Sequence, residues 1–143
     1  MMTSFGLETL SEQECETLLA NHEFGRVAVW TGEHPAVLPV LYRMFEGDVV
    51  FRTAPGEKLI AAVLSQEIVF EIDGIEPARR TGWSVNVVGR AEHIVDHLEK
   101  QRVAQLGLEP WAGDYRDEYV RLRTERASGR RIRSDTGALS TGP

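Results

Sequence analysis

The sequence predicts a mainly β protein, a six-stranded antiparallel β-barrel with peripheral helices packed outside it. Three observations lead to this fold class. Six β-rich segments are joined mostly by short turns, and one short helix interrupts them after the third segment. In addition, Pro39, Gly82 and Gly89 stand within or at the start of strands, where the closure of a barrel needs bends.

The first predicted element is a helix from residue 12 to about residue 22. Ser11 and Glu14 have the spacing of a capping box, in which each side chain satisfies a free backbone N–H of the first turn. Cys15, Leu18 and Leu19 then share the face that we expect to be buried. Gly25 should release the chain into the first strand.

The remaining elements follow from alternation, turn residues and apolar runs. The predicted strands cover residues 26–30, 36–45, 49–53, 68–72, 82–94 and 119–123, and two further helices cover residues 57–64 and 97–106. Pro39 lies inside the second strand. Because proline has no N–H for a β-ladder, that position should face an edge, a bulge or a ligand.

The elements define one domain over residues 11–133. Residues 1–10 are expected to form a flexible N-terminal arm. Residues 134–143 contain Gly, Ser, Thr and Pro with little apolar content, which predicts a disordered C-terminal tail.

Composition excludes several classes of protein. The 143 residues carry a net charge of −6, which argues against a general nucleic-acid binder. No apolar run approaches the ~20 residues that a membrane-spanning helix needs. The single cysteine cannot form an intramolecular disulfide, and a reducing cytoplasm fits that usage best. We therefore expect a soluble cytoplasmic domain.

The junction after the third strand is the main candidate site. Arg52 and Thr53 end the strand, a Pro-Gly turn follows, and Lys58 stands in the first turn of the next helix. A helix start directs free N–H groups and its positive end at one point, and an anion binds there readily. The cluster therefore predicts a phosphate site, although solvated surface residues would give the same spacing.

Other motifs leave more than one interpretation open. Trp83 and Ser84 begin the long fifth strand, where they either pack in the core or line a planar ligand. Six arginines near the C-terminus indicate a solvated strand face with a frayed basic tail, or a contact with a second anionic group or another subunit; nucleic-acid binding is a third choice, which the charge balance disfavours. They are Arg121, Arg123, Arg126, Arg130, Arg131 and Arg133. No nucleophile–base pair stands out, so a bound cofactor would carry any redox chemistry.

The order of these motifs resembles the pyridoxamine 5′-phosphate oxidase-like family, the flavin-binding split β-barrels, and in particular its small actinobacterial-type members. The resemblance spans roughly residues 10 to 133. The motifs are Phe51-Arg52-Thr53, Gly56-x-Lys58-Leu59, Gly82-Trp83-Ser84-Val85, Pro110-Trp111 and Ser128-Gly129-Arg130-Arg131-Ile132.

The resemblance implies an FMN-binding homodimer with two cofactor sites at the subunit interface. It places the flavin phosphate on Arg52, Thr53 and Lys58. It places the ring along the second strand, at Pro39, Val40, Leu41 and Tyr42. Trp83 and Ser84 would line the site, in one chain or from the partner, and Arg130 would stand at its rim.

The activity implied is that of an oxidoreductase, with hydride transfer between the flavin and a small substrate that the sequence does not identify. Tyr42 is the one candidate proton donor. The chain lacks the C-terminal segment that reads pyridoxal in true pyridoxamine phosphate oxidases, which puts that substrate in doubt. The alternatives are a deazaflavin coenzyme, which the C-terminal arginines would suit, and a non-catalytic carrier of flavin or haem.

Overall fold

A computed structural model describes residues 6–52, 57–109 and 119–133, and of residues 57–60 it describes the backbone alone. Its strands are β1 (Leu7–Thr9), β2 (Phe24–Trp30), β3 (Pro35–Phe45), β4 (Asp48–Arg52), β5 (Glu67–Glu76), β6 (Thr81–His93) and β7 (Tyr119–Ile132). Its helices are α1 (Glu12–Ala20), α2 (Glu57–Ser65) and α3 (His97–Ala104).

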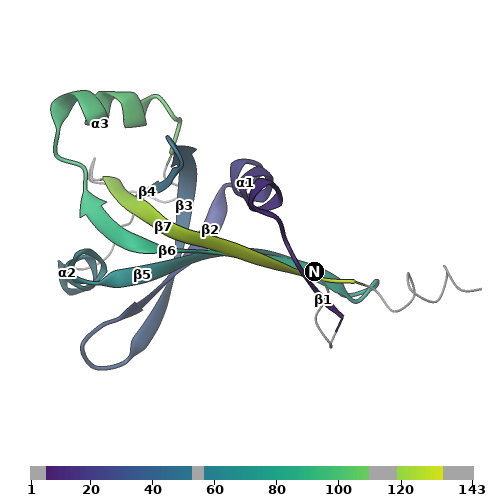
Figure 1. The fold of residues 1–143 in the computed structure, drawn as a ribbon. Coiled ribbons are helices and arrows are strands. Elements are labelled where there is room, and N and C mark those ends of the chain that lie inside the picture. The colour runs from purple at the N-terminus through teal and green to yellow at the C-terminus, as the bar shows by residue number, and fades with distance from the viewer. Residues whose placement is uncertain (1–5, 53–56, 110–118, 134–143) are drawn as a thin grey trace, which may run out of the picture.

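Strands β2 to β7 close into the predicted barrel (Figure 1). Neighbouring strands run antiparallel in the order β7-β4-β3-β2-β5-β6, and the pairing of β6 with β7 completes the ring. Antiparallel closure leaves no open sheet edge around the ring. Within the described residues, the expected six-stranded antiparallel barrel with helices outside it is confirmed.

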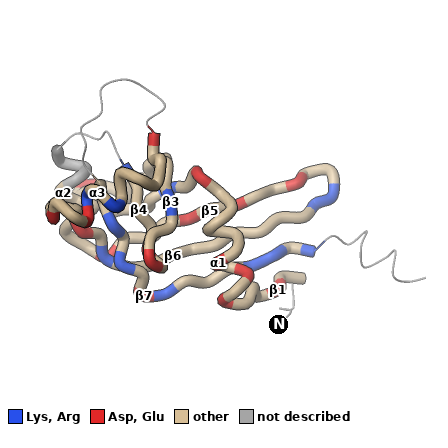
Figure 2. Tube along the Cα trace, turned by 90° about the horizontal axis from the view of Figure 1, so that it is seen from above, with Lys and Arg blue, Asp and Glu red and all other residues tan. Residues whose placement is uncertain are grey.

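Strand β7 extends well beyond the predicted residues 119–123. Its first part pairs with β4 on one side, and its last three residues pair with β1, while β6 follows it along almost its whole length. The second half of β7 is mostly exposed and rich in arginine, as the basic segments along β7 in Figure 2 show. It therefore lacks the apolar alternation from which a strand is predicted.

The chain segment before α1 differs from the flexible arm that we expected. Over its described part, residues 7–9 form β1, which pairs with β7 through Leu7 and Ile132 at one end. Leu10 is buried in the core. Ser11 then caps α1, and the capping box with Glu14 is present in both directions, as predicted.

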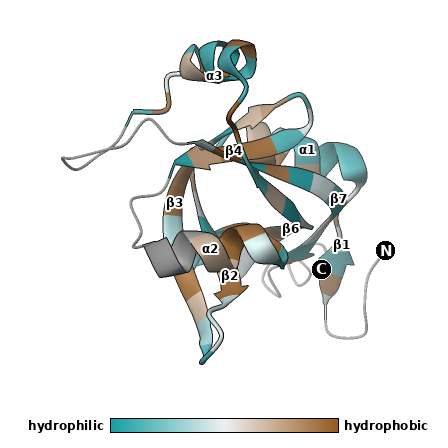
Figure 3. Cartoon of the chain, turned by 90° about the vertical axis from the view of Figure 1, so that its left-hand side faces the viewer, coloured by the Kyte–Doolittle hydropathy of each residue, from teal (hydrophilic) through white to brown (hydrophobic). Residues whose placement is uncertain are grey.

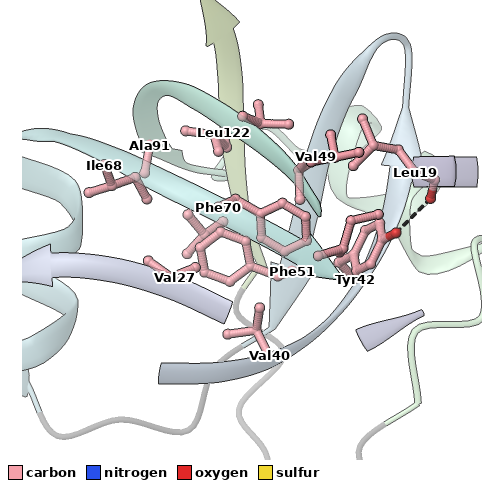
Figure 4. Packing of buried hydrophobic residues seen from close by; sticks show 14 of the residues in the cluster. Leu19, Val27, Val40, Tyr42, Val49, Phe51, Ile68, Phe70, Ala91 and Leu122 are labelled. Atoms are coloured by element: carbon pink, nitrogen blue, oxygen red, sulfur yellow. Dashed lines mark hydrogen bonds between the residues drawn. The ribbon is translucent and has the colours of Figure 1, made fainter. Parts of the chain in front are cut away.

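The barrel interior is filled by alternate residues of each strand. On β3, Val40 and Tyr42 point inward and are buried, with Tyr42 fully so. The Tyr42 ring meets Phe70 edge-on, at 4.7 Å between ring centroids. Helix α1 covers one end of the barrel, where the Tyr42 hydroxyl donates a 2.6 Å hydrogen bond to the Leu19 carbonyl (Figure 4).

A second, smaller core lies outside the barrel wall, beneath α3. We call it the α3 core; its buried members are Phe45, Val50, Ile94, Val103, Leu108 and Tyr119. Val50 and Tyr119 occupy outward positions on β4 and β7, opposite in direction to their inward neighbours Phe51 and Val120. Helix α3 is thus attached to the outer surface at the end of β4.

One of the predicted bends is seen, at Gly89. The register between β6 and β7 shifts between Val88 and Gly89, and a Cβ on Gly89 would lie 1.9 Å from the Arg123 carbonyl oxygen. Pro39 pairs with Arg26 of β2. In the described residues, the pairing of β3 with β4 begins at Leu41; the positions that would face Pro39 across this pairing lie outside them, so an edge at Pro39 stays a prediction.

Candidate functional site

The end of β4 directs Arg52 to the outer surface of the barrel. Alternation along β4 buries Val49 and Phe51 inside the barrel and turns Val50 and Arg52 outward. Arg52 stands opposite Leu41 in the β3–β4 register, and Leu41 is half-buried against the α3 core. Arg52 and Leu41 are therefore neighbours on one face.

Two members of the α3 core hold the Arg52 guanidinium. Its Nη1 donates a 3.1 Å hydrogen bond to the carbonyl oxygen of Leu108. Its central carbon lies 5.0 Å from the centroid of the Tyr119 ring, close enough for a favourable cation–π contact. The guanidinium is thus fixed on the surface at the last residue of β4.

The other two predicted phosphate ligands are Thr53 and the side chain of Lys58, and both lie outside the described residues. The backbone of α2 begins at Glu57. The proposed convergence of Arg52, Thr53 and Lys58 therefore stays a prediction, with Arg52 as its described member. The Pro110-Trp111 motif also falls outside the described residues.

On β3, the structure separates the four predicted ring-contacting residues into two faces. Val40 and Tyr42 point into the barrel, so only their backbone groups reach a ligand on the outer surface. Pro39 and Leu41 point outward. Burial raises the pKa of Tyr42 far above its ordinary value, and its hydroxyl is bonded to Leu19; the hypothesis that Tyr42 donates a proton to a surface ligand therefore lacks structural support.

Trp83 and Ser84 of β6 also face opposite sides. Trp83 packs against the barrel core, and its ring centroid lies 4.9 Å from that of His22. Ser84 points outward, opposite Asp73 of β5 and Arg130 of β7. Arg130 is exposed. Trp83 therefore acts mainly in packing, whereas Ser84 and Arg130 are accessible side by side.

The outward residues of the site fall on one line around the barrel, which we call the outer band. Its members, from β4 to β7, are Arg52, Leu41, Phe24, Asp73, Ser84 and Arg130: strand pairing joins the first three and the last three, and Phe24 and Asp73 line the same hollow. Arg52 and Ser84 are four strand spacings apart, which is about 19 Å of barrel surface at ~4.8 Å for each spacing. Within one chain, Arg52 of the predicted phosphate site and Ser84 of the predicted ring site are therefore far apart.

Two hollows adjoin the middle of the outer band. The larger has a volume of about 700 Å³ and includes Phe24, Arg43 and Asp73 in its lining. The smaller, of about 200 Å³, lies between Leu41 and Leu108. Arg43 lines both, and its Nη2 makes a 3.1 Å ion pair with Glu23.

Arg26, Glu71 and Asp73 form an ionic cluster beside the predicted ring-binding strand. The Arg26 Nη1 lies 2.9 Å from Asp73 and 3.3 Å from Glu71, and Arg26 stands opposite Pro39. Burial raises the pKa of Glu71 to about 7, and so does the hydrogen bond that the protonated Glu71 carboxyl donates to Asp73. Neither this cluster nor Arg43 was predicted, because their contacts join strands that are distant in sequence.

Two further searches concern metal-binding clusters and membrane-spanning helices. No three His, Cys, Asp or Glu side chains gather in a metal-binding arrangement within residues 6–52, 57–109 and 119–133. In the same part of the chain, no helix has the length and apolar character needed to cross a bilayer.

Comparison with known proteins places this fold in a family. A family model described as pyridoxamine 5′-phosphate oxidase matches residues 11–131. An uncharacterised protein of Mycobacterium tuberculosis is 35% identical over 132 residues, covering 89% of this chain and 86% of that protein.

Solved structures agree in fold. The FAD-binding protein from Mycobacterium smegmatis is 30% identical, with a TM-score of 0.74 over 87% of this chain and 98% of its own. A structure from Corynebacterium glutamicum, named as a putative pyridoxamine 5′-phosphate oxidase, is 26% identical, with a TM-score of 0.75 over 92% of this chain and 98% of its own. The motifs, the closed barrel and these matches agree, and the chain belongs to the pyridoxamine 5′-phosphate oxidase-like family of split β-barrels.

Proposed function

We propose that this protein is a flavin-dependent oxidoreductase that binds FMN and transfers a hydride between the flavin and a small substrate. The observation that carries the proposal is the placement of Arg52. It stands on the outer surface at the end of β4, which precedes α2 in the chain, and Leu108 and Tyr119 hold its guanidinium. The relative from Mycobacterium smegmatis that is named for FAD binding supports a flavin.

The residues of this chain would bind, orient and shield the cofactor. Arg52, together with Thr53, Lys58 and the N–H groups at the start of α2, would hold the phosphate. The predicted edge of β3 at Pro39 offers backbone groups for the polar rim of the ring, and Leu41 offers an apolar contact. The bound flavin would supply the hydride chemistry.

A homodimer belongs to the same proposal, because the outer face of β2 and β3 is apolar and exposed. Ala28 pairs with Val37 and Trp30 pairs with Pro35 on this face. Val37 is 62% exposed and Trp30 is 52% exposed. Figure 3 shows hydrophobic segments on both strands. Such a surface is suited to burial against a second copy, which would bring Ser84 and Arg130 of the partner to the site.

One observation favours the deazaflavin alternative. The second half of β7 exposes Arg126 and Arg130, and the polyanionic tail of a deazaflavin coenzyme would be attracted to such a basic strand. FMN remains the first choice. Arg52, the described member of the predicted phosphate cluster, lies at the opposite end of the outer band from Arg130. A cytoplasmic location completes the proposal.

The test is a set of titrations of the purified protein with FMN, FAD, riboflavin and a deazaflavin coenzyme. Flavin fluorescence quenching gives each affinity. Riboflavin lacks the phosphate, so the ratio of FMN to riboflavin affinity isolates the phosphate contact. In Arg52→Met this ratio should fall at least about tenfold, the effect of losing one charge-assisted hydrogen bond. Arg126→Met is the matched control on an exposed arginine, and an unchanged ratio in Arg52→Met would reject the phosphate assignment.

Turnover needs a separate measurement. The bound flavin should bleach under anaerobic conditions when a nicotinamide or deazaflavin donor is added, and its colour should return with an electron acceptor. Tight binding without any donor-dependent bleaching would replace the oxidoreductase with the non-catalytic carrier. Preferential binding of the deazaflavin would establish the other alternative.

A further inference from the structure

Arg121 of β7 is buried within a cluster of carboxylates. Its side chain is 6% exposed. Its Nε donates a 2.8 Å hydrogen bond to Asp48, and its Nη1 lies 3.4 Å from Glu46 and 3.5 Å from Glu99. Glu46 lies in the β3–β4 turn and Asp48 begins β4, whereas Glu99 lies in the first turn of α3. Arg121 therefore joins the helix to the barrel wall.

The ring of Phe45 forms the centre of the same cluster. The guanidinium carbons of Arg102 and Arg121 each lie 4.9 Å from the centroid of this ring. Arg102 comes from the last turn of α3, and it also makes a 2.5 Å ion pair with Glu46. The first and last turns of α3 are thus both fixed to the β3–β4 turn.

The Arg121–Asp48 pair is the buried part of this cluster, and a buried ion pair is a weak source of stability. The cost of removing charges from water largely offsets their attraction, whereas the loss of one partner leaves an uncompensated buried charge. What such contacts supply well is one defined arrangement of the elements that they join. In this chain, the elements are α3 and the strands that carry the site.

The position of α3 affects one of the two contacts of Arg52, the one with Leu108, whereas Tyr119 is already placed by the β4–β7 pairing. The helix runs directly into residues 105–109, and Val103 and Leu108 pack in the α3 core together with Tyr119. Leu108 supplies the carbonyl that accepts from Arg52, and Tyr119 supplies the ring beneath its guanidinium. Arg43 is held from the same segment, through a 3.3 Å hydrogen bond to the Gly107 carbonyl.

We propose that Arg121 is a positioning residue for the cofactor phosphate. It fixes α3 on the barrel and thereby places the Leu108 carbonyl that orients Arg52. This inference rests on the proposed phosphate role of Arg52. Arg121 itself does not touch the cofactor, because it lies beneath α3 and contacts Asp48, Glu46, Glu99 and Phe45.

The experiment compares FMN with riboflavin in Arg121→Met. We expect FMN affinity to fall about tenfold, while riboflavin affinity changes by less than about twofold, since only the phosphate contact depends on the orientation of Arg52. A general loosening of the fold would instead weaken both ligands together. An unchanged affinity ratio in a folded Arg121→Met protein would overturn the proposal.

A double variant addresses the stability of the fold. Arg121→Met leaves the Asp48 carboxylate without its shortest ion pair, so Arg121→Met with Asp48→Asn removes the uncompensated charge as well. The thermal midpoint of the double variant should rise above that of the single variant. Its FMN-to-riboflavin ratio should stay low, because the link to Glu99 is still missing. Recovery of the ratio together with stability would show that Arg121 is merely structural.

Arg123→Met is the matched control. Arg123 lies on the same strand and contacts the same Asp48 at 3.5 Å, but its main partner is Glu92 and it is about half exposed. The Arg123→Met change should leave the affinity ratio at the wild-type value; an equal loss in Arg123→Met would refute a role specific to Arg121.

Arg52→Met distinguishes a failure of the phosphate assignment from a failure of the inference about Arg121. If it leaves the ratio unchanged, the phosphate assignment fails and this inference falls with it. If it lowers the ratio and Arg121→Met does not, only this inference fails.

Discussion

The hydroxyl of Tyr42 donates a 2.6 Å hydrogen bond to the backbone carbonyl of Leu19. This contact joins the inside of the barrel to the helix that covers its end. The Leu19 carbonyl lies in the last turn of α1, where carbonyl groups lack partners within the helix. A side chain predicted for the ligand surface is thus used to attach α1 to the core.

The change Tyr42→Phe should destabilise the fold without changing flavin affinity. It keeps the ring that packs on Phe70 but leaves the Leu19 carbonyl unsatisfied, which costs about 1–3 kcal/mol. Urea unfolding followed by circular dichroism measures this free energy. Unchanged stability, or a lost flavin affinity in a folded variant, would contradict the structural role of the hydroxyl.

Gly89→Ala should be among the most destabilising single changes in the barrel. Its Cβ would lie 1.9 Å from the Arg123 carbonyl oxygen, an atom of the backbone that cannot move alone. The β6–β7 pairing at the bulge would have to separate, at a cost of about 2–4 kcal/mol. Thermal unfolding measures the effect, with the exposed Ser128→Ala on β7 as a control expected to stay within about 0.5 kcal/mol.

The pKa of Glu71 predicts a pH-dependent stability. Folded Glu71 holds its proton up to about pH 7, whereas the unfolded side chain releases it near 4.5. The folded state therefore binds more protons between these values, and the free energy of unfolding should fall as the pH rises from about 4.5 to about 7.

Glu71→Gln removes this titration and serves as the comparison. Above pH 7 the variant should gain about 1 kcal/mol over the wild type, an amount limited by solvent screening of the partly exposed group and by the loss of its contact with Arg26. Urea unfolding at several pH values gives both curves. Parallel curves for the two proteins between pH 4.5 and 7 would exclude Glu71 as the titrating group.

Local signals in the sequence were sufficient to predict most of the fold. The capping box at Ser11 and Glu14 depends on residues three apart, so the start of α1 is visible without tertiary information. The missing ladder donor of Pro39 and the small size of Gly89 likewise indicate an edge and a bulge. The second half of β7 was missed because its neighbours β1 and β6 stabilise it, and its own residues are exposed and charged.

The site was less predictable for the same reason. Arg52 could be identified from its place before a turn and a helix. Its neighbour Tyr119 reaches it through the β4–β7 pairing, and Leu108 reaches it from the segment that follows α3. Arg121 was grouped with surface arginines because sequence alone cannot show that α3 buries it. Contacts between elements distant in sequence carry no local pattern.

The proposed dimer makes a prediction about the outer face of β2 and β3. Val37→Asp places a charge where an apolar surface would be buried between subunits, so desolvation of the carboxylate should split the dimer into monomers. Val37 is exposed in the single chain, and the change should therefore leave the monomer fold intact. Val95→Asp is the matched control, since Val95 is 74% exposed just before α3, away from this face.

Light scattering coupled to size-exclusion chromatography gives the mass of each variant. A dimeric Val37→Asp protein, or a wild-type monomer, would move the subunit contact elsewhere. Loss of flavin binding together with the dimer would support cofactor sites completed by Ser84 and Arg130 of the second copy.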